Sequence, residues 1–377
     1  MLVFVAVLLL VLGVIHLYLW KRLVSDTTAS GRLSRAGAAL LAVLLALPIG
    51  ALVGELGPLE WIGFVWVGVM FYLLVVLLVL EVPRVVTWIA ARRRGGLDPG
   101  RRLFLSRAFA GTALVVSATA AAVGVSTATG RIPVRRVQVR LGRLDPALSG
   151  YRIAVLGDVH LGRLIGREEL AEHVRTVNAE EPGLVAVVGD LVDGGVEELG
   201  ETAETLRDLR SQDGTYFVTG NHEYFSGAQE WVDFLTGIGV RVLRNERVEI
   251  GRDGAVFDLA GVDDVSAAGS GEAGHGADLG AALAGRDTDR PIVLLAHQPV
   301  QVDAAAEQRV DLQISAHTHG GQIWPFHYIV LLSQPVLAGL SRVRGTWLYV
   351  TRGVGYSGPP MRVGAPPEIT IIELVAG

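Results

Sequence analysis

The chain has 377 residues, of which 50% are hydrophobic, and its mean hydropathy is +0.43. This value is too high for an ordinary water-soluble enzyme, and the apolar excess lies in the first third, so the composition indicates a membrane region joined to a water-soluble region. The net charge of −5 gives no reason to expect a nucleic-acid partner, and the absence of cysteine excludes disulfides and thiolate metal sites.

Four apolar stretches in the first third are long enough, or nearly so, to cross a bilayer, whose hydrocarbon core takes about 20 helical residues. They are Met1–Trp20, Ala36–Val53, Trp61–Val82 and Ala108–Ala128. The first stretch lacks a basic leading segment and a cleavage site, so we interpret it as an anchor and not as a signal peptide. We therefore expect a multi-pass transmembrane region with four helices over residues 1–128.

The loops between these stretches differ in positive charge, which sets the orientation of membrane helices. Loop 54–60 carries only glutamates as charged residues, whereas loops 21–35 and 83–107 are rich in lysine or arginine. These two loops are therefore expected in the cytoplasm. The fourth stretch then crosses outward, which predicts an extracytoplasmic second half; a second half that faces inward is the alternative.

The fourth stretch is preceded by Arg101-Arg102-Leu103-Phe104-Leu105, which resembles the twin-arginine export signal. The segment that follows is rich in small residues and less hydrophobic than the first three stretches. Such a signal would make the twin-arginine export machinery a partner of this chain. A plain fourth helix with basic flanks is the other interpretation.

Residues 129–150 are predicted to form a linker and an edge strand, Val134–Leu141, in which apolar and basic residues alternate. From residue 151 onward, strands and helices alternate and then strands dominate. The predicted strands are Tyr151–Leu156, Leu184–Val188, Thr215–Thr219, Val240–Leu243, Ala255–Ala260, Ile292–Leu295, Leu312–Ser315, Thr346–Thr351 and Ile369–Leu374. The predicted helices are Arg167–Ala179, Val196–Leu209 and Ala228–Ile238. The pattern predicts an α/β domain over 151–377 with two sheets packed face to face and flanked by helices, an αββα sandwich.

Five short motifs in the second half each follow a predicted strand. They are Gly157-Asp158-Val159-His160, Gly189-Asp190-Leu191-Val192-Asp193, Gly220-Asn221-His222-Glu223, His297 in Ala-His-Gln-Pro, and His317-Thr318-His319. A strand followed at once by Gly-Asp places a carboxylate at the carboxyl end of a sheet, where the sites of α/β proteins form. The motifs can therefore converge on one point, and their oxygen and imidazole ligands suit two divalent ions of the Mn, Fe or Zn type.

Two such ions about 3.5–4 Å apart can hold a hydroxide and clamp the attacking and leaving oxygens of a phosphate ester. Asp190 is the natural ligand to bridge them. Asn221 offers a neutral oxygen and can stabilise charge on the phosphoryl oxygens. His222 could protonate the leaving group, and Asp193 could fix the tautomer of His222.

The order of the motifs resembles that of the calcineurin-like metallophosphoesterase superfamily, in which Asp-x-His, Gly-Asp-x-x-Asp, Gly-Asn-His-[Asp/Glu], His and His-x-His follow one another. The resemblance covers about residues 150–320, and no ligand position departs from the pattern. Residues 316–322 and Gly353-Val354-Gly355-Tyr356-Ser357 are similar, more narrowly, to a membrane-associated bacterial branch. That branch includes twin-arginine-exported, cell-wall-associated phosphoesterases.

The resemblance implies two metal ions, with manganese as the first expectation. The first would take Asp158, His160, Asp190 and His319, and the second would take Asp190, Asn221, His297 and His317. It also implies a membrane-anchored hydrolase that cleaves a phosphodiester or pyrophosphate, such as a lipid-linked or nucleotide-sugar compound, by attack of a metal-bridging hydroxide. The alternative is a membrane sensor or transport-linked protein that uses the phosphoesterase fold as a ligand-binding domain.

Several other residues have weaker interpretations. His173 is expected at the surface of its helix, and His327 is the best remaining histidine for contact with substrate. His16 and Glu81 lie near the ends of apolar stretches and are expected to be solvated there. The apolar segment 324–332 is expected in the core, although in a tethered enzyme an exposed patch there could instead meet the bilayer.

Overall fold

The computed structural model describes residues 2–53, 57, 59–93, 98–252 and 254–377. The chain divides into two compact units. Unit 1 consists of Met1–Thr129 with Gly358–Met361, and unit 2 consists of Gly130–Ser357 with Arg362–Gly377. Met1, Glu55 and Arg94, to which the sequence analysis assigned places in a span or loop, lie outside the described residues.

Unit 1 is helical. Its elements are α1 (Leu2–Leu19), the π-helix η1 (Trp20–Ser25), α2 (Gly31–Val53), α3 (Leu59–Arg92) and α4 (Pro99–Thr129). Among the described residues, three helical segments are long and apolar enough to cross a membrane: Gly31–Gly50, Leu59–Arg92 and Pro99–Thr129. The first predicted stretch does form a helix, α1, but it is not one of these three, so the predicted count of four spans is not confirmed.

Two polar residues of the apolar helices in unit 1, His16 and Glu81, have partners inside the unit. The indole N–H of Trp66 donates to Nε2 of His16 at 3.2 Å, and Nδ1 of His16 lies 2.8 Å from the carbonyl oxygen of Leu12. His16 is therefore buried and satisfied, and the expectation that it is solvated is wrong. Glu81 accepts hydrogen bonds from Tyr18 at 2.8 Å and Arg22 at 2.9 Å. These contacts join the end of α1 and the start of η1 to α3.

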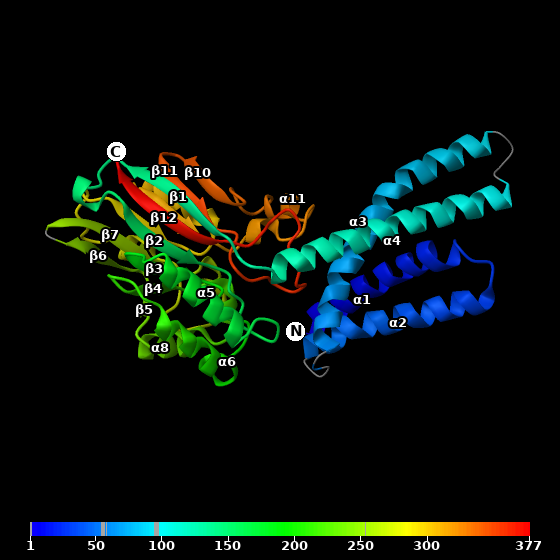
Figure 1. Ribbon diagram of the computed structural model, residues 1–377, viewed down its shortest axis with the longest axis horizontal. Coiled ribbons are helices and arrows are strands. Elements are labelled where there is room, and N and C mark those ends of the chain that lie inside the picture. The colour runs from blue at the N-terminus through cyan, green and yellow to red at the C-terminus, as the bar shows by residue number, and fades with distance from the viewer. Residues whose placement is uncertain (1, 54–56, 58, 94–97, 253) are drawn as a thin grey trace. The chain divides into compact units, whose positions relative to one another are not determined.

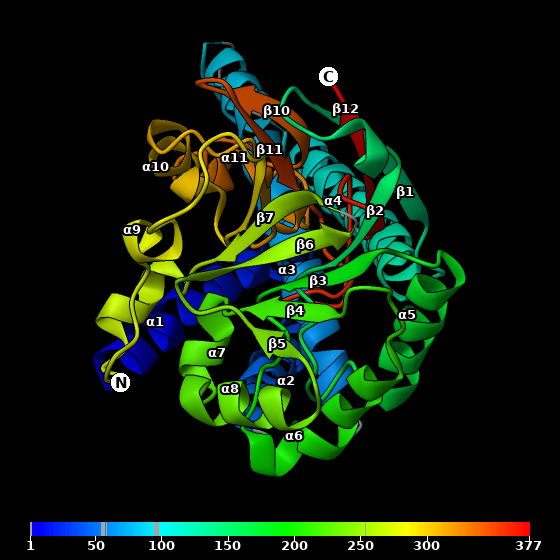
Figure 2. The same ribbon diagram turned by 90° about the vertical axis from the view of Figure 1, so that its left-hand side faces the viewer.

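Two six-stranded sheets form the centre of unit 2 (Figures 1 and 2). The first sheet has the spatial order β1 (Val134–Leu141), β12 (Ile369–Ala376), β2 (Tyr151–Leu156), β3 (Leu184–Val188), β4 (Thr215–Val218) and β5 (Arg241–Val242). The second has the order β10 (Gly339–Val343), β11 (Thr346–Val350), β9 (Leu312–Ser315), β8 (Ile292–Leu295), β7 (Ala255–Gly261) and β6 (Glu246–Arg252). Strands β2, β3 and β4 are parallel to one another, as are β7, β8 and β9, so their carboxyl ends lie along one edge of each sheet.

A continuous apolar core lies between the two sheets. Alternate residues of the central strands supply it, because successive side chains of a strand point to opposite faces. The first sheet contributes Ile153, Val155, Ala186 and Val188, and the second contributes Leu259, Val293, Leu295, Leu312 and Ile314. The residues between them, such as Ala154, Val187 and Leu294, are also fully buried, so the outer faces of the central strands are covered as well.

Helices cover these outer faces. Helices α5 (Arg167–Ala179), α6 (Val196–Ala203) and α8 (Ala228–Gly237) lie beside the first sheet, and α9 (Leu279–Ala282) and α10 (Val302–Glu307) lie on the side of the second (Figure 2). The structure therefore has the predicted two sheets flanked by helices. Two further short helices are α7 (Asn221–Phe225) and α11 (His327–Val330).

The predicted elements agree with the observed ones except at the sheet edges and in short helices. The sequence analysis missed β6 and β10, which are edge strands and lack the apolar runs of the central strands. The predicted helix Val196–Leu209 is α-helical only to Ala203 and continues as a 3₁₀ helix over Glu204–Asp208. Helix α4 extends to Thr129, so the linker before β1 has only the residues 130–133.

His173 on α5 is buried, with 7% of its surface exposed, so its predicted place at the helix surface is wrong. Its Nδ1 atom has no hydrogen-bond partner among the described residues, and burial lowers its pKa from 6.5 to about 4. The unfolded chain therefore binds a proton at this residue more readily than the folded chain does. The resulting stability is fully present above pH 6.5 and is lost as the pH falls toward 4.

We expect the His173→Leu variant in detergent to lose less of its thermal unfolding midpoint between pH 7.5 and pH 5 than the unmodified chain does, because it lacks one of the buried histidines with a lowered pKa. The pKa difference of His173 corresponds to at most about 3 kcal/mol at the acid limit. The matched control is His327→Leu, at a partly exposed histidine, which should retain the full pH dependence. An undiminished fall in the His173→Leu variant would contradict the assignment.

Candidate active site

The residues of the five sequence motifs lie at the carboxyl ends of strands from both sheets. In the first sheet, Asp158 follows β2, Asp190 follows β3 and Asn221 follows β4. In the second sheet, His297 follows β8 and His317 follows β9. Because the two sheets pack face to face, their edges meet and bring both sets of side chains together.

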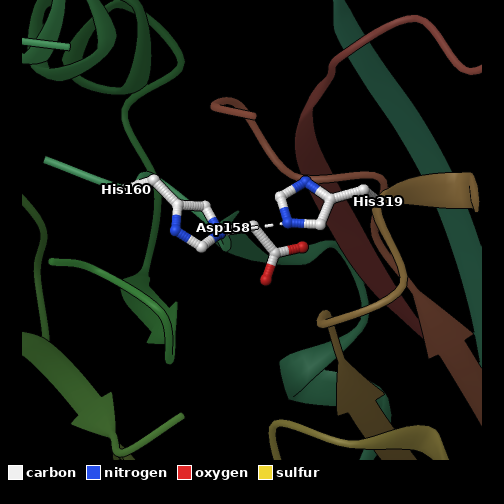
Figure 3. Close-up of side chains that lie close together, drawn as sticks. All are labelled: Asp158, His160 and His319. Atoms are coloured by element: carbon white, nitrogen blue, oxygen red, sulfur yellow. Dashed lines mark hydrogen bonds between the residues drawn. The ribbon is translucent and has the colours of Figure 1, made fainter. Parts of the chain in front are cut away.

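Among the described residues, three groups of side chains could hold a metal ion, and two of them consist only of predicted metal ligands. The first is Asp158, His160 and His319, which are all buried and point toward one another (Figure 3). The second is Asp190, His297 and His317, and in each group the possible ligand atoms lie within 4.8 Å of one another. Each group takes residues from both sheets.

Asp190 links these groups, and Asn221 lies beside the second. The Oδ2 atom of Asp190 lies 3.2 Å from Nε2 of His297 and 4.0 Å from Nε2 of His160, so it faces both groups. The Oδ1 atom of Asn221 lies 3.3 Å from Nε2 of His297. The structure thus brings together all seven residues that the sequence analysis assigned to metals.

The donor set fits divalent metal ions. Oδ2 of Asp158 and Nδ1 of His317 are buried and have no hydrogen-bond partner within the described parts of the chain, although buried polar atoms rarely lack one. Nε2 of His160 lies 3.0 Å from Nε2 of His319. Burial lowers the pKa of His317 to about 3 and that of His319 well below its usual range, so both imidazoles are neutral and offer a lone pair. Carboxylate oxygen with neutral imidazole is a common ligand set for Mn, Fe and Zn.

The backbone is strained at these residues. Five of them have positive φ angles: Asp158 (50°), His160 (52°), Asp190 (50°), His317 (71°) and His319 (51°). They make up half of the ten non-glycine residues with positive φ in the described part of the chain. Because this conformation is unfavourable for L-residues, its concentration here indicates that a function and the surrounding hydrogen bonds maintain it.

Two glycines allow the backbone to approach the carboxylates closely. A Cβ atom at Gly220 would collide with the backbone nitrogen and the carboxylate of Asp190. A Cβ atom at Gly353, whose φ is +70°, would lie 2.6 Å from Cβ of Asp158. The glycines of the Gly-Asn-His-Glu and Gly-Val-Gly-Tyr-Ser motifs are therefore required sterically, beside the candidate ligands.

Asp193 holds two histidines through one carboxylate oxygen. Its Oδ1 atom lies 2.8 Å from Nδ1 of His160 and 2.7 Å from Nδ1 of His222. Burial would raise the pKa of Asp193, but these hydrogen bonds lower it to about 2. Burial would lower the pKa of His222, but the hydrogen bond to Asp193 and the charge of Asp190 raise it to about 9. His222 is partly exposed and carries a proton at neutral pH, so it can act as a proton donor.

Glu223 has a role that the sequence analysis did not assign, although it lies within a motif. It is fully buried, and its carboxylate accepts hydrogen bonds from the backbone N–H groups of Asp190 at 3.0 Å, Leu191 at 2.8 Å and Gly220 at 2.6 Å. These bonds fix the turn after β3 against the turn after β4. Burial and the nearby Asp190 raise the pKa of Glu223 to about 7.

Arg362 is a second residue that the sequence analysis missed. It is fully buried, and its guanidinium donates to the carbonyl oxygens of His319 at 2.7 Å and Gly355 at 3.0 Å. Burial lowers its pKa to about 10, so it remains charged at neutral pH. Arg362 joins the His-x-His turn to the loop that contains Gly353. No motif marks this arginine in the sequence.

His327, the best remaining histidine for contact with substrate, lies outside the two groups, as do His275 and Asp263. His275 contacts Tyr224 and Gln229, and Asp263 forms an ion pair with Arg244, so both have structural partners. His327 packs against Gly321, where an added Cβ would lie 2.6 Å from Cα of His327. The expectation that segment 324–332 belongs to the core is wrong, because six of its seven large apolar side chains are exposed and Val330 is only partly buried.

Comparison with known proteins identifies the family. The family described as Calcineurin-like phosphoesterase matches residues 151–321. The chain is 40% identical over 303 residues to the Bos taurus protein named "Transmembrane protein with metallophosphoesterase domain", which covers 78% of this chain and 68% of the relative. It is 30% identical over 382 residues to the metallophosphoesterase Cj0846 of Campylobacter jejuni, which covers 99% of this chain and 98% of the relative. It is 37% identical over 247 residues to a Helicobacter pylori metallophosphoesterase, which covers 65% of this chain and 64% of the relative.

The motif order, the two candidate metal groups and these relatives agree, and the chain therefore belongs to the calcineurin-like metallophosphoesterases, which are metal-dependent phosphoester hydrolases.

Proposed function

We propose that this chain is a membrane-anchored, two-metal phosphoesterase that hydrolyses a phosphodiester or pyrophosphate of the cell envelope. The observation that carries the proposal is the position of Asp190 between two groups of metal-ligand type. In this proposal, residues 1–128 form the membrane anchor, residues 129–150 form the linker and edge strand, and residues 151–377 form the catalytic domain.

The proposed ligand sets follow the two groups. One ion would be held by Asp158, His160, Asp190 and His319, and the other by Asp190, Asn221, His297 and His317. Two divalent ions supply an activated water and neutralise negative charge on the phosphate. Manganese is the first expectation for their identity, by family resemblance.

In this proposal, protein side chains position the ligands and supply a proton to the leaving group. Asp193 accepts from Nδ1–H of His160 and so directs Nε2 of His160 toward the first group. The same carboxylate orients His222, whose protonated ring gives a proton to the leaving oxygen of the ester. Asn221 stabilises charge on the phosphoryl oxygens. Glu223 keeps Asp190 and Gly220 in place through their backbone N–H groups.

Location and substrate class rest on the membrane-crossing helices and the names of relatives. Three described helices suit a bilayer, and the bovine relative is named a transmembrane protein. The charge of the loops favours an extracytoplasmic catalytic domain, and Arg101-Arg102 favours export by the twin-arginine route. A substrate of the envelope, such as a lipid-linked diester or a nucleotide-sugar pyrophosphate, would meet the enzyme at this location.

We expect the purified full chain, reconstituted with Mn²⁺, to hydrolyse a chromogenic phosphodiester faster than the matching monoester. Asp190→Asn should abolish turnover, because it removes the one carboxylate charge that faces both groups of proposed ligands. His222→Gln should lower kcat by roughly 10²–10⁴-fold, the usual loss for a general acid, and leave metal binding in place. His275→Gln is the matched control and should retain activity.

Near-normal activity in Asp190→Asn would refute the two-metal assignment. If the unmodified chain binds metal but hydrolyses neither ester, a narrow pyrophosphate substrate or the ligand-sensor alternative gains support.

Metal affinity gives a separate check on the site. We expect Gly220→Ala to weaken Mn²⁺ binding by roughly 10- to 100-fold, because the added Cβ displaces Asp190. Gly195→Ala is the control, since a Cβ atom there meets nothing within 4 Å. Titration of each variant with Mn²⁺ measures the difference, and equal affinity in the two variants would contradict the packing argument.

The orientation can be tested because the chain has no native cysteine. We expect Glu201→Cys to react with a membrane-impermeant maleimide in intact cells, and Ser30→Cys, in a loop predicted to be cytoplasmic, to remain unlabelled. Adding Arg101→Lys and Arg102→Lys to Glu201→Cys should abolish that labelling by trapping the domain inside. The export proposal fails if labelling at residue 201 is unaffected by the two lysines.

A further inference from the structure

An exposed apolar surface lies next to the candidate active site. Its large side chains, here called the α11 surface, are Trp324, Phe326, Tyr328, Ile329, Leu331 and Leu332. Their exposed fractions range from 40% for Phe326 to 87% for Leu332. We propose that the α11 surface inserts into the interfacial layer of a lipid bilayer and holds the catalytic unit against it.

Exposed apolar residues are concentrated here. Among the described residues of 130–377, nine large hydrophobic side chains are exposed, and six of them fall within the nine residues 324–332. The other three, Phe225, Val265 and Val300, are widely separated in the sequence. Scattered exposed apolar residues are normal on a soluble surface, whereas a contiguous patch marks contact with an apolar partner.

The composition of the segment favours lipid as that partner. No aspartate or glutamate occurs between Asp311 and Glu368, so this part of the chain brings no carboxylate toward lipid phosphates. Trp324, Phe326 and Tyr328 are aromatic, and tryptophan and tyrosine are enriched where a membrane meets water. Mixed aromatic and aliphatic side chains on one surface are typical of proteins that lie in this layer without crossing the membrane.

The backbone N–H groups of this segment are hydrogen-bonded within the segment, as contact with lipid requires. The N–H of Leu331 donates to the carbonyl oxygen of His327 at 3.1 Å, and that of Leu332 donates to Ile329 at 3.0 Å. The N–H of Tyr328 donates to the carbonyl oxygen of Pro325 at 3.2 Å. Since these groups are paired within the segment, the side chains can enter lipid without exposing unsatisfied backbone donors.

Strand register places the incoming chain and the metal groups at one edge of unit 2. Val134, the first residue of β1, pairs with Ile369 of β12, and the next residue of β12, Thr370, pairs with Val155 near the end of β2. The start of β1 therefore lies at the edge where β2 leads to Asp158. Segment 324–332 follows the His-x-His turn at this same edge, where His327 packs against Gly321.

The short linker limits how far this edge can be from the membrane. Helix α4, one of the three helices that suit a bilayer, ends at Thr129, and only residues 130–133 precede β1. Four extended residues reach at most about 14 Å. Both the linker and the α11 surface therefore favour a catalytic edge that faces the bilayer. Resting on the proposed function, this arrangement admits substrates whose phosphate lies in the head-group layer.

Depth-dependent quenching in vesicles tests the proposal on the full chain. Leu332→Cys, at the most exposed residue of the surface, is labelled with an environment-sensitive fluorophore and reconstituted in phosphatidylethanolamine and phosphatidylglycerol. We expect lipids that carry a nitroxide near the head group to quench this label at least about twofold more than a label at Glu201→Cys, and its emission to shift to the blue. Equal quenching by aqueous iodide at the two positions would overturn the proposal.

If a protein and not lipid covers the α11 surface, the labelling experiment gives a different result. A disulfide between two copies of the unlabelled Leu332→Cys variant, without lipid quenching of the labelled one, would assign the α11 surface to a second copy of the chain and overturn the bilayer proposal. A label at residue 332 that is shielded from both lipid and iodide would show that protein covers the surface, with the same consequence.

Activity adds a readout that separates this inference from the proposed function. Ile329→Ser with Leu332→Ser changes only exposed side chains, so the fold and the hydrolysis of a water-soluble phosphodiester should be retained. Hydrolysis of a phosphodiester embedded in vesicles should fall roughly tenfold. If the unmodified chain cleaves neither ester, the proposed function fails, whereas the quenching result still decides the bilayer contact. Equal loss on both esters would contradict a role in membrane contact.

Discussion

Apolar packing between the two sheets is the interaction on which the candidate site depends. Each candidate metal group takes residues from both sheets: Asp158 and His160 meet His319, and Asp190 meets His297 and His317. Neither sheet alone holds a complete group. The core of alternating side chains from β2, β3, β7, β8 and β9 therefore determines whether these atoms face one another. A cavity in this core would alter ligand distances as well as stability, because protein interiors are close-packed and transmit strain.

Apolar packing sets the positions of the strands, but polar contacts set the shapes of the turns. Positive φ angles at Asp158, Asp190 and His319 are unfavourable, and burial of the neighbouring backbone adds a further cost unless its donors and acceptors are paired. Glu223 pairs the N–H groups of the turn after β3, and Arg362 pairs the carbonyl of His319. Glu223 therefore supports the turns of the first sheet, and Arg362 supports the turn after β9 of the second. Metal ligation would stabilise these turns further, because unpartnered atoms such as Oδ2 of Asp158 would then gain a partner.

The sequence predicted those features that depend on neighbouring residues and missed those that depend on distant ones. A buried central strand is an apolar run and its ligands follow at once, so the two sheets and the seven converging residues were predictable. The edge strands β6 and β10 lack such runs. Nothing near Arg362 in the sequence shows that it approaches His319, because 42 residues separate them. The sequence shows that His173 lies on a helix with many polar residues, but its burial depends on which face of α5 packs against the sheet. Segment 324–332 has the composition of a core strand, and only the fold shows that its side chains lie outside.

The distribution of ionisable groups favours an anchored enzyme over a transport-linked protein. A transport path needs polar groups that can change partners, whereas His16 and Glu81 are held by Trp66, Tyr18 and Arg22 within unit 1. The groups arranged for chemistry lie in unit 2, where Asp193 orients a protonated His222 at the partly exposed rim of the metal groups. A sensor would need the ligand cluster to bind phosphate, but it would not need a proton donor beside that cluster. The placement of His222 therefore argues for turnover of a phosphoester over ligand sensing.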